Sequence, residues 1–399
     1  MAEAFNIFNT FMNTFDKKGK KVDAFYLLNN GDVDRFHFPL PPVLERAIRS
    51  KLDSRKYGYS RPQGNDGICK KIAQYEKTIS NSPISQSNIA LTSGVTSGLE
   101  MILDLLKKEG TLLLPTPSYP LGEALAERHN IPTIKFQTKE ENNYLLTASE
   151  LETQIDDTVR LLLLTNPNNP TGIAYSKTEL DKIKDICQRK EIYLIIDEIF
   201  SGLMLNGNSH HIPSYNINSE KVIRLNGWSK DRGVAGFRIG YIVAPDSIIR
   251  NLSETISLTM GNAPTVFNNF ISKDMLLRRL LLEEGNIPET VLLEYNEYKA
   301  QITSNLRKYE RNKQLITSYL SEVDRITYLS NTMGGYCMFI KFDAVSNTES
   351  FLRDLYKNTG VLLVPGSGFN CTEPGWARLS FSVDPIRLEK GLEAMSSYL

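Results

Sequence analysis

Four polar side chains that could share one site occur in order along the middle of this chain. Asn169 lies in the stretch Asn-Pro-Asn-Asn-Pro-Thr-Gly, Asp197 ends the apolar run 193–196, and Lys230 and Arg238 lie in Ser-Lys-Asp-Arg-Gly-Val-Ala-Gly-Phe-Arg. An unprotonated amine can bond to an aldehyde carbon, a buried carboxylate can hold a protonated ring nitrogen, and a guanidinium can bind an anion. These residue types therefore indicate chemistry at carbonyl and amino groups.

Pyridoxal 5′-phosphate (PLP) requires this set of groups, and nearby segments supply the remainder. A turn containing Gly94, Val95 and Thr96 precedes a helical pattern, and free N–H groups at a helix N-terminus bind phosphate. Ser229 can add a hydroxyl, and Tyr119, in Pro-Thr-Pro-Ser-Tyr-Pro, can cover a ring face. The sequence therefore predicts a PLP site with Lys230 as its amine.

The elements that must position these residues alternate strands with helices. Short apolar runs typical of strands covered on both faces occur at 111–114, 160–164, 193–196, 222–225 and 238–243. The stretches Thr147 to Glu150 and Ser176 to Glu179 match capping boxes and predict helix starts between the strands. This alternation favours an α/β unit, with Lys230 just past a strand end, where ligands of open sheets bind.

After Gly285 the pattern changes. Pro288 begins a long helical stretch, followed by a strand at 335–342, a helix near 348–358 and an apolar run at 361–364. This order predicts a smaller α+β domain, which residues 1 to about 45 complete.

Taken together, these motifs resemble the class I/II aminotransferase family of fold-type I PLP enzymes from about residue 25 to the C-terminus. The resemblance implies an α/β fold in which helices flank a mostly parallel seven-stranded sheet, plus a smaller α+β domain. The expected boundaries are 46–285 for the large PLP-binding domain, and 1–45 with 286–399 for the small domain.

The resemblance also implies roles for individual residues. Lys230 is similar to the lysine that forms the Schiff base and carries the Cα proton, and Asp197 to the partner of the pyridinium nitrogen. The remaining cofactor-binding residues implied are Asn169 at the phenolate oxygen, Tyr119 on the ring, and Gly94, Val95, Thr96, Ser229 and Arg238 at the phosphate.

A homodimer and a substrate site are implied as well. Tyr59, five residues before Gly64, matches a tyrosine that reaches the phosphate of the other subunit. Arg378 matches the arginine that binds the substrate α-carboxylate, with Gly31 and Asn169 beside it. Asp32 could meet a cationic substrate side chain such as a guanidinium, or it could be a solvated loop acid.

Two positions depart from the family pattern. Phe200 stands where many transaminases have a tyrosine that donates to the PLP phenolate, and its loss should raise the pKa of the Schiff base with Lys230. Gly227 replaces a frequent phosphate-binding serine. An aminotransferase that exchanges the amino group with a 2-oxo acid is therefore the first expectation. A PLP-dependent lyase, cyclase, dehydratase, decarboxylase or oxidase of an amino acid in specialised metabolism is the alternative, with a cationic, arginine-like amino acid as one substrate option.

A third class, a transcription regulator that uses this fold as a sensor, would need a DNA-binding module. The roughly 25 residues before the resemblance contain no helix-turn-helix pattern.

Composition excludes several other classes. The 399 residues include 46 Lys+Arg and 46 Asp+Glu, so the zero net charge indicates no nucleic-acid partner. Four scattered cysteines favour reduced thiols and a cytoplasmic location. The adjacent pair His210 and His211 is a loop feature rather than a metal site, so no metal is expected. We expect neither a membrane span nor a secretory signal.

The N-terminal segment has phenylalanines at helical spacing. Phe5, Phe8, Phe11, Met12 and Phe15 share one face. A helix packed on its own chain or on a partner subunit is the first interpretation, and a helix folded over the substrate is the second.

Overall fold

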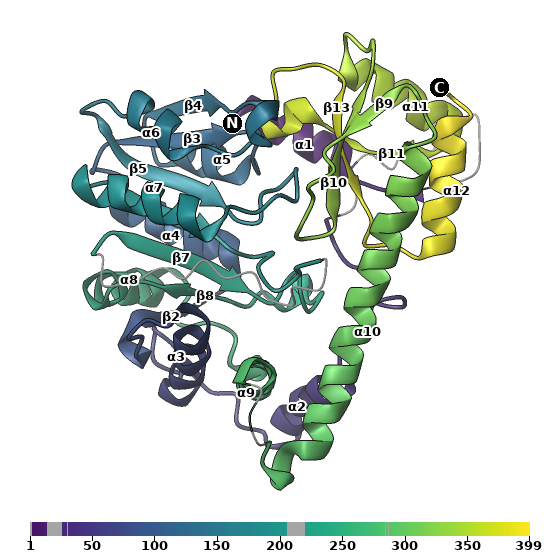
Figure 1. Cartoon of the computed structure of the whole chain (residues 1–399). Helices are drawn as coiled ribbons and strands as arrows, with labels where there is room; N and C mark the ends of the chain where they lie inside the picture. Colours follow the sequence, from purple (N-terminus) through teal and green to yellow (C-terminus); the bar gives the residue numbers. More distant parts are fainter. Residues whose placement is uncertain (1, 14–25, 30, 206–219, 284, 286) are drawn as a thin grey trace.

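The chain forms a large and a small β-sheet, each covered by helices (Figure 1). The computed structural model describes residues 2–13, 26–29, 31–205, 220–283, 285 and 287–399. His210, His211 and Phe15 lie outside the described residues.

The large sheet has seven strands in the order β2-β8-β7-β6-β5-β3-β4, and only β8 runs antiparallel to its neighbours. The strands are β2 (Ile89–Thr92), β3 (Thr111–Thr116), β4 (Thr133–Gln137), β5 (Val159–Thr165), β6 (Tyr193–Asp197), β7 (Val222–Gly227) and β8 (Gly240–Val243). This confirms the predicted mostly parallel sheet. The predicted strand 238–243 begins two residues late, because Arg238 has a φ of 53°, which a strand does not allow.

Alternating side chains of the buried strands point to opposite faces of the large sheet. Leu162 and Leu194 pack with α6 (Ala148–Gln154) and α7 (Lys177–Arg189) on one face. The opposite face, which includes Leu161, Ile195 and Leu225, packs against α4 (Val95–Leu106), α5 (Leu121–Arg128) and α8 (Asp246–Thr259). Both faces are therefore covered, as the continuous apolar runs predict.

The edge of this sheet at β2 and β8 supports a further helical layer. Ile89, Leu91 and Tyr241 pack with α2 (Pro42–Asp53), α3 (Asp66–Ser80) and α9 (Asn268–Glu283). Short 3₁₀ helices occupy Gln86–Asn88, Glu140–Asn142, Ala235–Phe237, Thr265–Phe267 and Gly366–Phe369.

The two predicted helix caps have different outcomes. At α6 the capping box is complete, because Thr147 accepts from the Glu150 amide and the Glu150 carboxylate accepts from the Thr147 amide. At α7 Ser176 accepts from the Glu179 amide, but the Glu179 carboxylate accepts from the Ala148 amide instead. Glu179 therefore joins the starts of two helices, and the second capping box is only half formed.

The C-terminal region carries the small sheet, whose antiparallel strand order is β12-β13-β10-β9. Its strands are β9 (Ile326–Tyr328), β10 (Cys337–Phe342), β12 (Val364–Pro365) and β13 (Trp376–Ser380), and its helices are α10 (Glu289–Leu320), α11 (Thr348–Thr359) and α12 (Pro385–Ser396). The strand predicted at 335–342 begins at Cys337 because Gly335 has a φ of 72°.

The apolar run 361–364 does not form one strand. Its residues divide between a separate two-stranded sheet and the small sheet. Its first half is β11 (Val361–Leu362), which pairs in parallel with β1 (Tyr26–Leu27) from the N-terminal segment. The second half begins β12. The pairing of β1 with β11 joins the N-terminal segment to the C-terminal region.

The N-terminal helix α1 (Glu3–Asn13) lies where the large and small sheets approach one another (Figure 1). It packs on α5, β12 and the 3₁₀ helix Gly366–Phe369. Phe8 and Phe11 are buried there, so the phenylalanine face packs on its own chain, as first interpreted.

Candidate functional site

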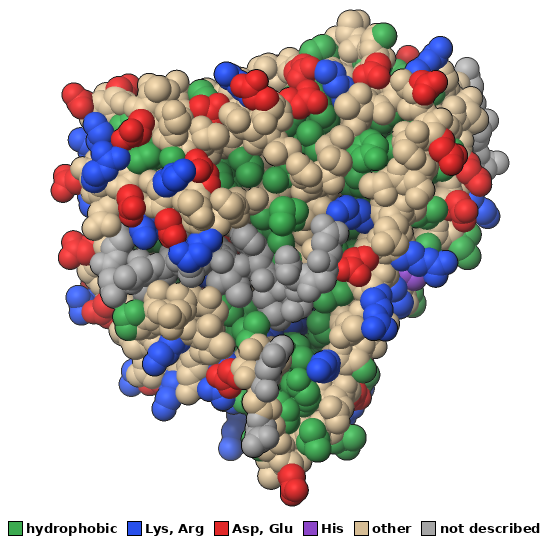
Figure 2. Space-filling view, viewed as in Figure 1, with side chains coloured by type: hydrophobic (Ala, Val, Ile, Leu, Met, Phe, Trp, Pro, Cys, Tyr) green, Lys and Arg blue, Asp and Glu red, His purple; other side chains and the backbone are tan. Residues whose placement is uncertain are grey.

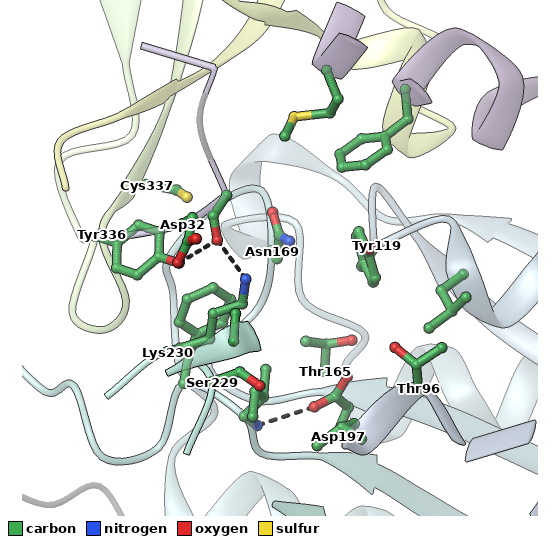
Figure 3. Close-up of a pocket in the computed structure, with 18 of the residues that line it drawn as sticks. Asp32, Thr96, Tyr119, Thr165, Asn169, Asp197, Ser229, Lys230, Tyr336 and Cys337 are labelled. Carbon is green, nitrogen blue, oxygen red and sulfur yellow. Dashed lines mark hydrogen bonds between the residues drawn. The ribbon is translucent and has the colours of Figure 1, made fainter. Parts of the chain in front are cut away.

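A cavity opens at the carboxyl ends of the parallel strands of the large sheet, beside α1 and the small sheet (Figure 3). Twelve of the residues predicted from the sequence line it: Gly31, Asp32, Val95, Thr96, Tyr119, Asn169, Asp197, Phe200, Ser229, Lys230, Arg238 and Arg378. The fold therefore gathers into one place residues that are far apart in the sequence. Gly94 lies directly beside Val95, at the N-cap of α4.

Lys230 follows β7 and points its amine into the cavity (Figure 3). The Nζ atom donates a hydrogen bond to the Gly31 carbonyl oxygen. Burial of the amine lowers the pKa of Lys230, and the nearby Arg378 guanidinium lowers it further. Both effects favour the neutral amine, the form that can act as a nucleophile or base.

Asp197 lies at the end of β6 and is 7% exposed. Its carboxylate accepts a hydrogen bond of 3.0 Å from the Ile199 amide (Figure 3). Burial raises the pKa of Asp197 to about 6, although this amide and Lys230 partly oppose the shift. A cationic partner in the cavity would therefore stabilise the ionised carboxylate.

The N-terminus of α4 and Arg238 form a cradle for an anion. Gly94 has a φ of 86° and caps α4 without a side-chain hydrogen bond, so the first amides of the helix are open to a ligand. A Cβ atom on Gly94 would lie 2.8 Å from an Arg238 terminal nitrogen, and one on Gly240 would lie 2.9 Å from the Val95 amide nitrogen. Glycine at both positions therefore keeps the cradle open.

Arg378, on β13, is 2% exposed and is held by several groups. One terminal nitrogen donates to Asn169 Oδ1 at 3.1 Å, and the other donates to the Asn29 carbonyl at 2.7 Å. Its guanidinium carbon lies 5.5 Å from the ring centre of Phe8 and 5.1 Å from that of Phe369. The Nε atom is buried and makes no hydrogen bond with the described residues.

Two pairs of aromatic rings shape the walls. Tyr119 meets the α1 residue Phe8 edge to face at 5.4 Å. Phe200, 6% exposed, meets Tyr336 edge to face at 5.3 Å. As the sequence indicated, position 200 brings no hydroxyl to this wall.

Phe8 and Met12 also line the cavity, in agreement with the second interpretation of the N-terminal helix. Sequence reasoning missed six lining residues: Leu121, Thr165, Ile199, Ala235, Tyr336 and Cys337. Thr165 could have been found, because it directly follows the strand predicted at 160–164. Phe8 and Met12 belong to the aromatic helix, so α1 covers the cavity as well as packing on its own chain. Tyr59 is 96% exposed and is not among the lining residues.

A cluster that we call the β6 network lies behind Asp197. Arg224 donates to Glu198 Oε2 at 2.8 and 2.6 Å and lies 2.8 Å from Glu76 Oε2. Tyr241 donates to the other Glu76 oxygen at 2.6 Å. Burial raises the pKa of Glu198 to about 7, partly offset by Arg224. This network joins α3 to β7, to β8 and to the residue that follows β6.

A second cluster, the α9 network, lies behind Lys230 and consists of Asp231, Arg232, Asp274 and Arg278. Arg232 Nε donates to Asp274 at 2.7 Å, and Arg278 lies 2.6 Å from Asp231 and also contacts Asp274. Burial alone would raise the pKa of Asp274, but Arg232 and Arg278 outweigh it and lower the pKa to about 2.

Two more donors complete this network. Trp228 Nε1 and the Tyr298 hydroxyl each donate to Asp274 at 2.8 Å. The network therefore fixes the residues on both sides of Lys230 against α9.

Comparison with known proteins agrees with this geometry. The model of the family "Aminotransferase class I and II" matches residues 25–395. The chain is 24% identical to an aspartate aminotransferase of Pyrococcus horikoshii, over 95% of this chain and 91% of the relative. It is 26% identical to the glutamate-pyruvate aminotransferase AlaA of Haemophilus influenzae, over 96% and 92%.

The same fold occurs in a solved aspartate aminotransferase double mutant from Thermus thermophilus, with a TM-score of 0.85 and 20% identity over 100% of this chain and 97% of that one. Together with the family match over most of the chain, this likeness accounts for the arrangement of the cavity and the two sheets. The chain therefore belongs to the class I and II aminotransferases, a family of enzymes that use PLP.

Proposed function

We propose that this cavity binds PLP and exchanges the α-amino group of an amino acid with a 2-oxo acid. The observation that carries the proposal is the convergence of Lys230, Asp197, Arg238 and Arg378 on one cavity. Each of these four groups has a different chemical task, and the four tasks fit one cofactor and one substrate. The names of the relatives, which act as aspartate and glutamate-pyruvate aminotransferases, support the reaction class.

The residues present fit PLP. The open N-terminus of α4 and Arg238 would hold the phosphate, since two glycines keep this cradle free of Cβ atoms. Asp197, whose raised pKa reflects a buried carboxyl lacking a full counter-charge, would hold the protonated ring nitrogen. Asn169 would donate its amide to the phenolate oxygen, and Tyr119 would cover the ring.

PLP, when bound, supplies an aldehyde for the amine and a ring that draws electrons from the bonds at the substrate Cα. Lys230 would take the proton from Cα, because its lowered pKa favours the neutral amine, the form that can accept it. Arg378 would bind the α-carboxylate through both terminal nitrogens after releasing the Asn29 carbonyl. Phe8 and Met12 would exclude water from the carboxylate side.

The direct test combines Lys230→Ala with trapping by borohydride. In the wild-type protein, reduction should attach PLP covalently to the peptide that contains Lys230, as seen by mass spectrometry. The Lys230→Ala variant should lose this adduct and at least about 1,000-fold in amino transfer. Lys221→Ala, which removes a lysine outside the cavity, should keep both. A reducible adduct in Lys230→Ala would refute the lysine assignment.

A PLP-dependent lyase, cyclase, dehydratase, decarboxylase or oxidase is the second candidate, and Phe200 and Asp32 favour it. Phe200 gives the cavity wall no phenol, and the Asp32 carboxylate lines the cavity where a cationic side chain could bind. Single amino acids, arginine included, should be mixed with the enzyme with and without 2-oxoglutarate or pyruvate. Transfer that requires the oxo acid supports the aminotransferase. Ammonia, carbon dioxide or peroxide formed without an acceptor supports the second candidate.

We also propose a homodimer in which Tyr59 completes the site of the partner subunit. Tyr59 is 96% exposed and Tyr57 is 51% exposed, which suits residues that become buried on association. Mixing Tyr59→Ala subunits with Lys230→Ala subunits should restore up to about a quarter of the wild-type activity, because half of the subunit pairs are mixed and each mixed pair has one intact site. No recovery in a confirmed mixed dimer would exclude the shared site.

We also propose a cytoplasmic location and no nucleic-acid partner. The four free cysteines are all buried, which supports the cytoplasmic location expected from the sequence. Among the described residues no helix is long and apolar enough to span a membrane. Charges of both signs are spread over the face shown in Figure 2, in keeping with the balanced charge of the chain.

A further inference from the structure

The carbonyl oxygen of Gly31 accepts hydrogen bonds from two side chains at once. One donor is the Lys230 amine, and the other is the Tyr336 hydroxyl, at 2.6 Å (Figure 3). Lys230 comes from the turn after β7, Gly31 from the N-terminal segment and Tyr336 from the segment before β10. One acceptor thus joins the amine to two otherwise separate parts of the molecule.

Local backbone structure brings Tyr336 to this position. Gly335 has a φ of 72°, and a Cβ there would lie 3.1 Å from the Phe200 ring. A Cβ on Gly334 would lie 2.4 Å from Pro167. These glycines let the chain pass close beside Phe200 before Tyr336 turns toward the cavity.

The Tyr336 ring is held on two sides. It meets Phe200 edge to face at 5.3 Å and stacks on Tyr309 at 6.0 Å. The side chain has no exposed surface, so its hydroxyl needs a buried partner, which Gly31 supplies. Burial raises the pKa of Tyr336 well above its usual value, so the hydroxyl keeps its proton and remains a donor.

The same wall lacks a hydroxyl at Phe200. In the pair formed by Phe200 and Tyr336, Tyr336 is therefore the residue that supplies a phenol to this wall. The Tyr336 hydroxyl donates a hydrogen bond to the Gly31 carbonyl, which also accepts from Lys230. The hydroxyl therefore acts on the amine through that carbonyl.

We propose that Tyr336 is a positioning residue for Lys230. Its hydroxyl holds the Gly31 carbonyl where that carbonyl accepts a hydrogen bond from the free Lys230 amine. Because the hydroxyl shares this acceptor, the carbonyl stabilises a charged Lys230 amine less. The inference rests on the proposed function of Lys230, because a neutral, fixed amine matters only if this lysine is the reactive group.

The test measures the pKa of Lys230 in the cofactor-free protein. Trace acetylation by acetic anhydride across a pH series, read on the Lys230 peptide by mass spectrometry, reports the neutral fraction of the amine. Tyr336→Phe removes the competing donor, so the Gly31 carbonyl accepts more strongly from the ammonium form and stabilises the charged amine. The midpoint should rise by roughly half to one pH unit.

Tyr309→Phe is the matched control, since it removes a hydroxyl from the same aromatic stack. Its midpoint should equal that of the wild type. An unchanged midpoint in Tyr336→Phe, or an equal rise in Tyr309→Phe, would overturn the proposal. If Tyr336→Phe does not fold, a fluorinated tyrosine placed at position 336 strengthens the donor, and the midpoint should fall. No fall would also overturn the proposal.

The steady-state kinetics of Tyr336→Phe test the proposal independently. Loss of one hydrogen bond that acts through Lys230 should lower kcat by roughly 2- to 10-fold with little change in KM. A change confined to KM would contradict the positioning role. The acetylation experiment needs no bound PLP, so its outcome is separate from that of the Lys230→Ala experiment, which decides whether Lys230 binds the cofactor.

Discussion

The β6 network and the α9 network are both fully buried, yet they differ in their ratio of carboxylates to guanidinium groups. The β6 network has two carboxylates for one guanidinium, whereas the α9 network has two of each. One follows Asp197 in the chain and the other follows Lys230. The cavity is therefore supported on one side by a cluster with an excess carboxyl group and on the other by a balanced one.

This difference determines how each network responds to protons. A buried carboxyl group can neutralise itself by taking up a proton, but a guanidinium cannot lose one in the accessible pH range. The pKa of Glu198 is raised to about 7, and that of Asp274 is lowered to about 2. We infer that the β6 network can adapt to a lost charge, while the α9 network cannot.

The largest expected effect comes from breaking the α9 network with Asp274→Ala. The change leaves Arg232 and Arg278 with one carboxylate and removes the acceptor of the Trp228 and Tyr298 donors. We expect the free energy of unfolding to fall by about 4–5 kcal/mol. Urea unfolding at pH 6 and pH 8 should give the same loss at both. A loss that varies strongly with pH would contradict the balanced charge count.

Arg224→Met should cost less. It leaves Glu76 and Glu198 without their cation, and we expect a loss of about 3 kcal/mol at pH 8. Because the carboxyl groups can take up protons, the loss should shrink at pH 6 in the same urea assay. Equal losses at the two pH values would remove the distinction between the networks.

The third prediction concerns the wild-type protein without cofactor. The pKa of Glu198 is about 7 in the folded state against an ordinary 4.5, so its contribution is fully present below pH 4.5 and is lost as pH rises to 7. The contribution of Asp274, with a pKa of about 2 against 3.8, is present above pH 3.8 and is lost as pH falls through 2. Between pH 5 and 8, Glu198 should therefore weaken stability by roughly 2–3 kcal/mol.

Glu198→Gln isolates the pH-dependent contribution of Glu198 to stability, because glutamine resembles the protonated acid and does not titrate. The variant should keep only the smaller decline caused by Asp197, whose pKa is also raised, to about 6. Thermal unfolding across pH 5–8 measures the difference between the two curves. Parallel curves for wild type and variant would show that Glu198 ionises normally.

The smallest effects come from removing one hydroxyl in each network. Tyr241→Phe takes away a donor from Glu76, and Tyr298→Phe takes one from Asp274, which keeps three other side-chain donors. We expect losses of about 2 and about 1 kcal/mol respectively, since the first carboxylate has fewer donors to replace the hydroxyl. The reverse order in urea unfolding would mean that donor number does not control these sites.

Local pattern was sufficient to predict much of the large sheet. The apolar runs that became β3, β5, β6 and β7 carry their signal within a few residues, and so do the glycine turn before α4 and the residues around Lys230. Those segments place most of the predicted lining residues. The strand predicted to contain Arg238 began late, because no local rule reveals a positive φ at an arginine.

Contacts between residues far apart in the chain could not be predicted from the sequence. Tyr336 and Gly31 are 305 positions apart, and Lys230 and Gly31 are 199 apart. Arg224 reads as an interruption in an apolar strand until Glu76 and Glu198 are seen around it. Such contacts depend on which elements become neighbours, and single-element periodicity carries no information about that.

The length of α10 has a mechanical consequence. Its 32 residues make a rod of about 48 Å, with its early turns on α2 and α9 and its later turns on α12 and β9. A tilt of only about 2° at one end of such a rod displaces the other end by roughly 1.7 Å, more than half the length of a hydrogen bond. Small adjustments of packing at α2 can therefore displace the end of α10 that contacts α12 and β9 of the small sheet.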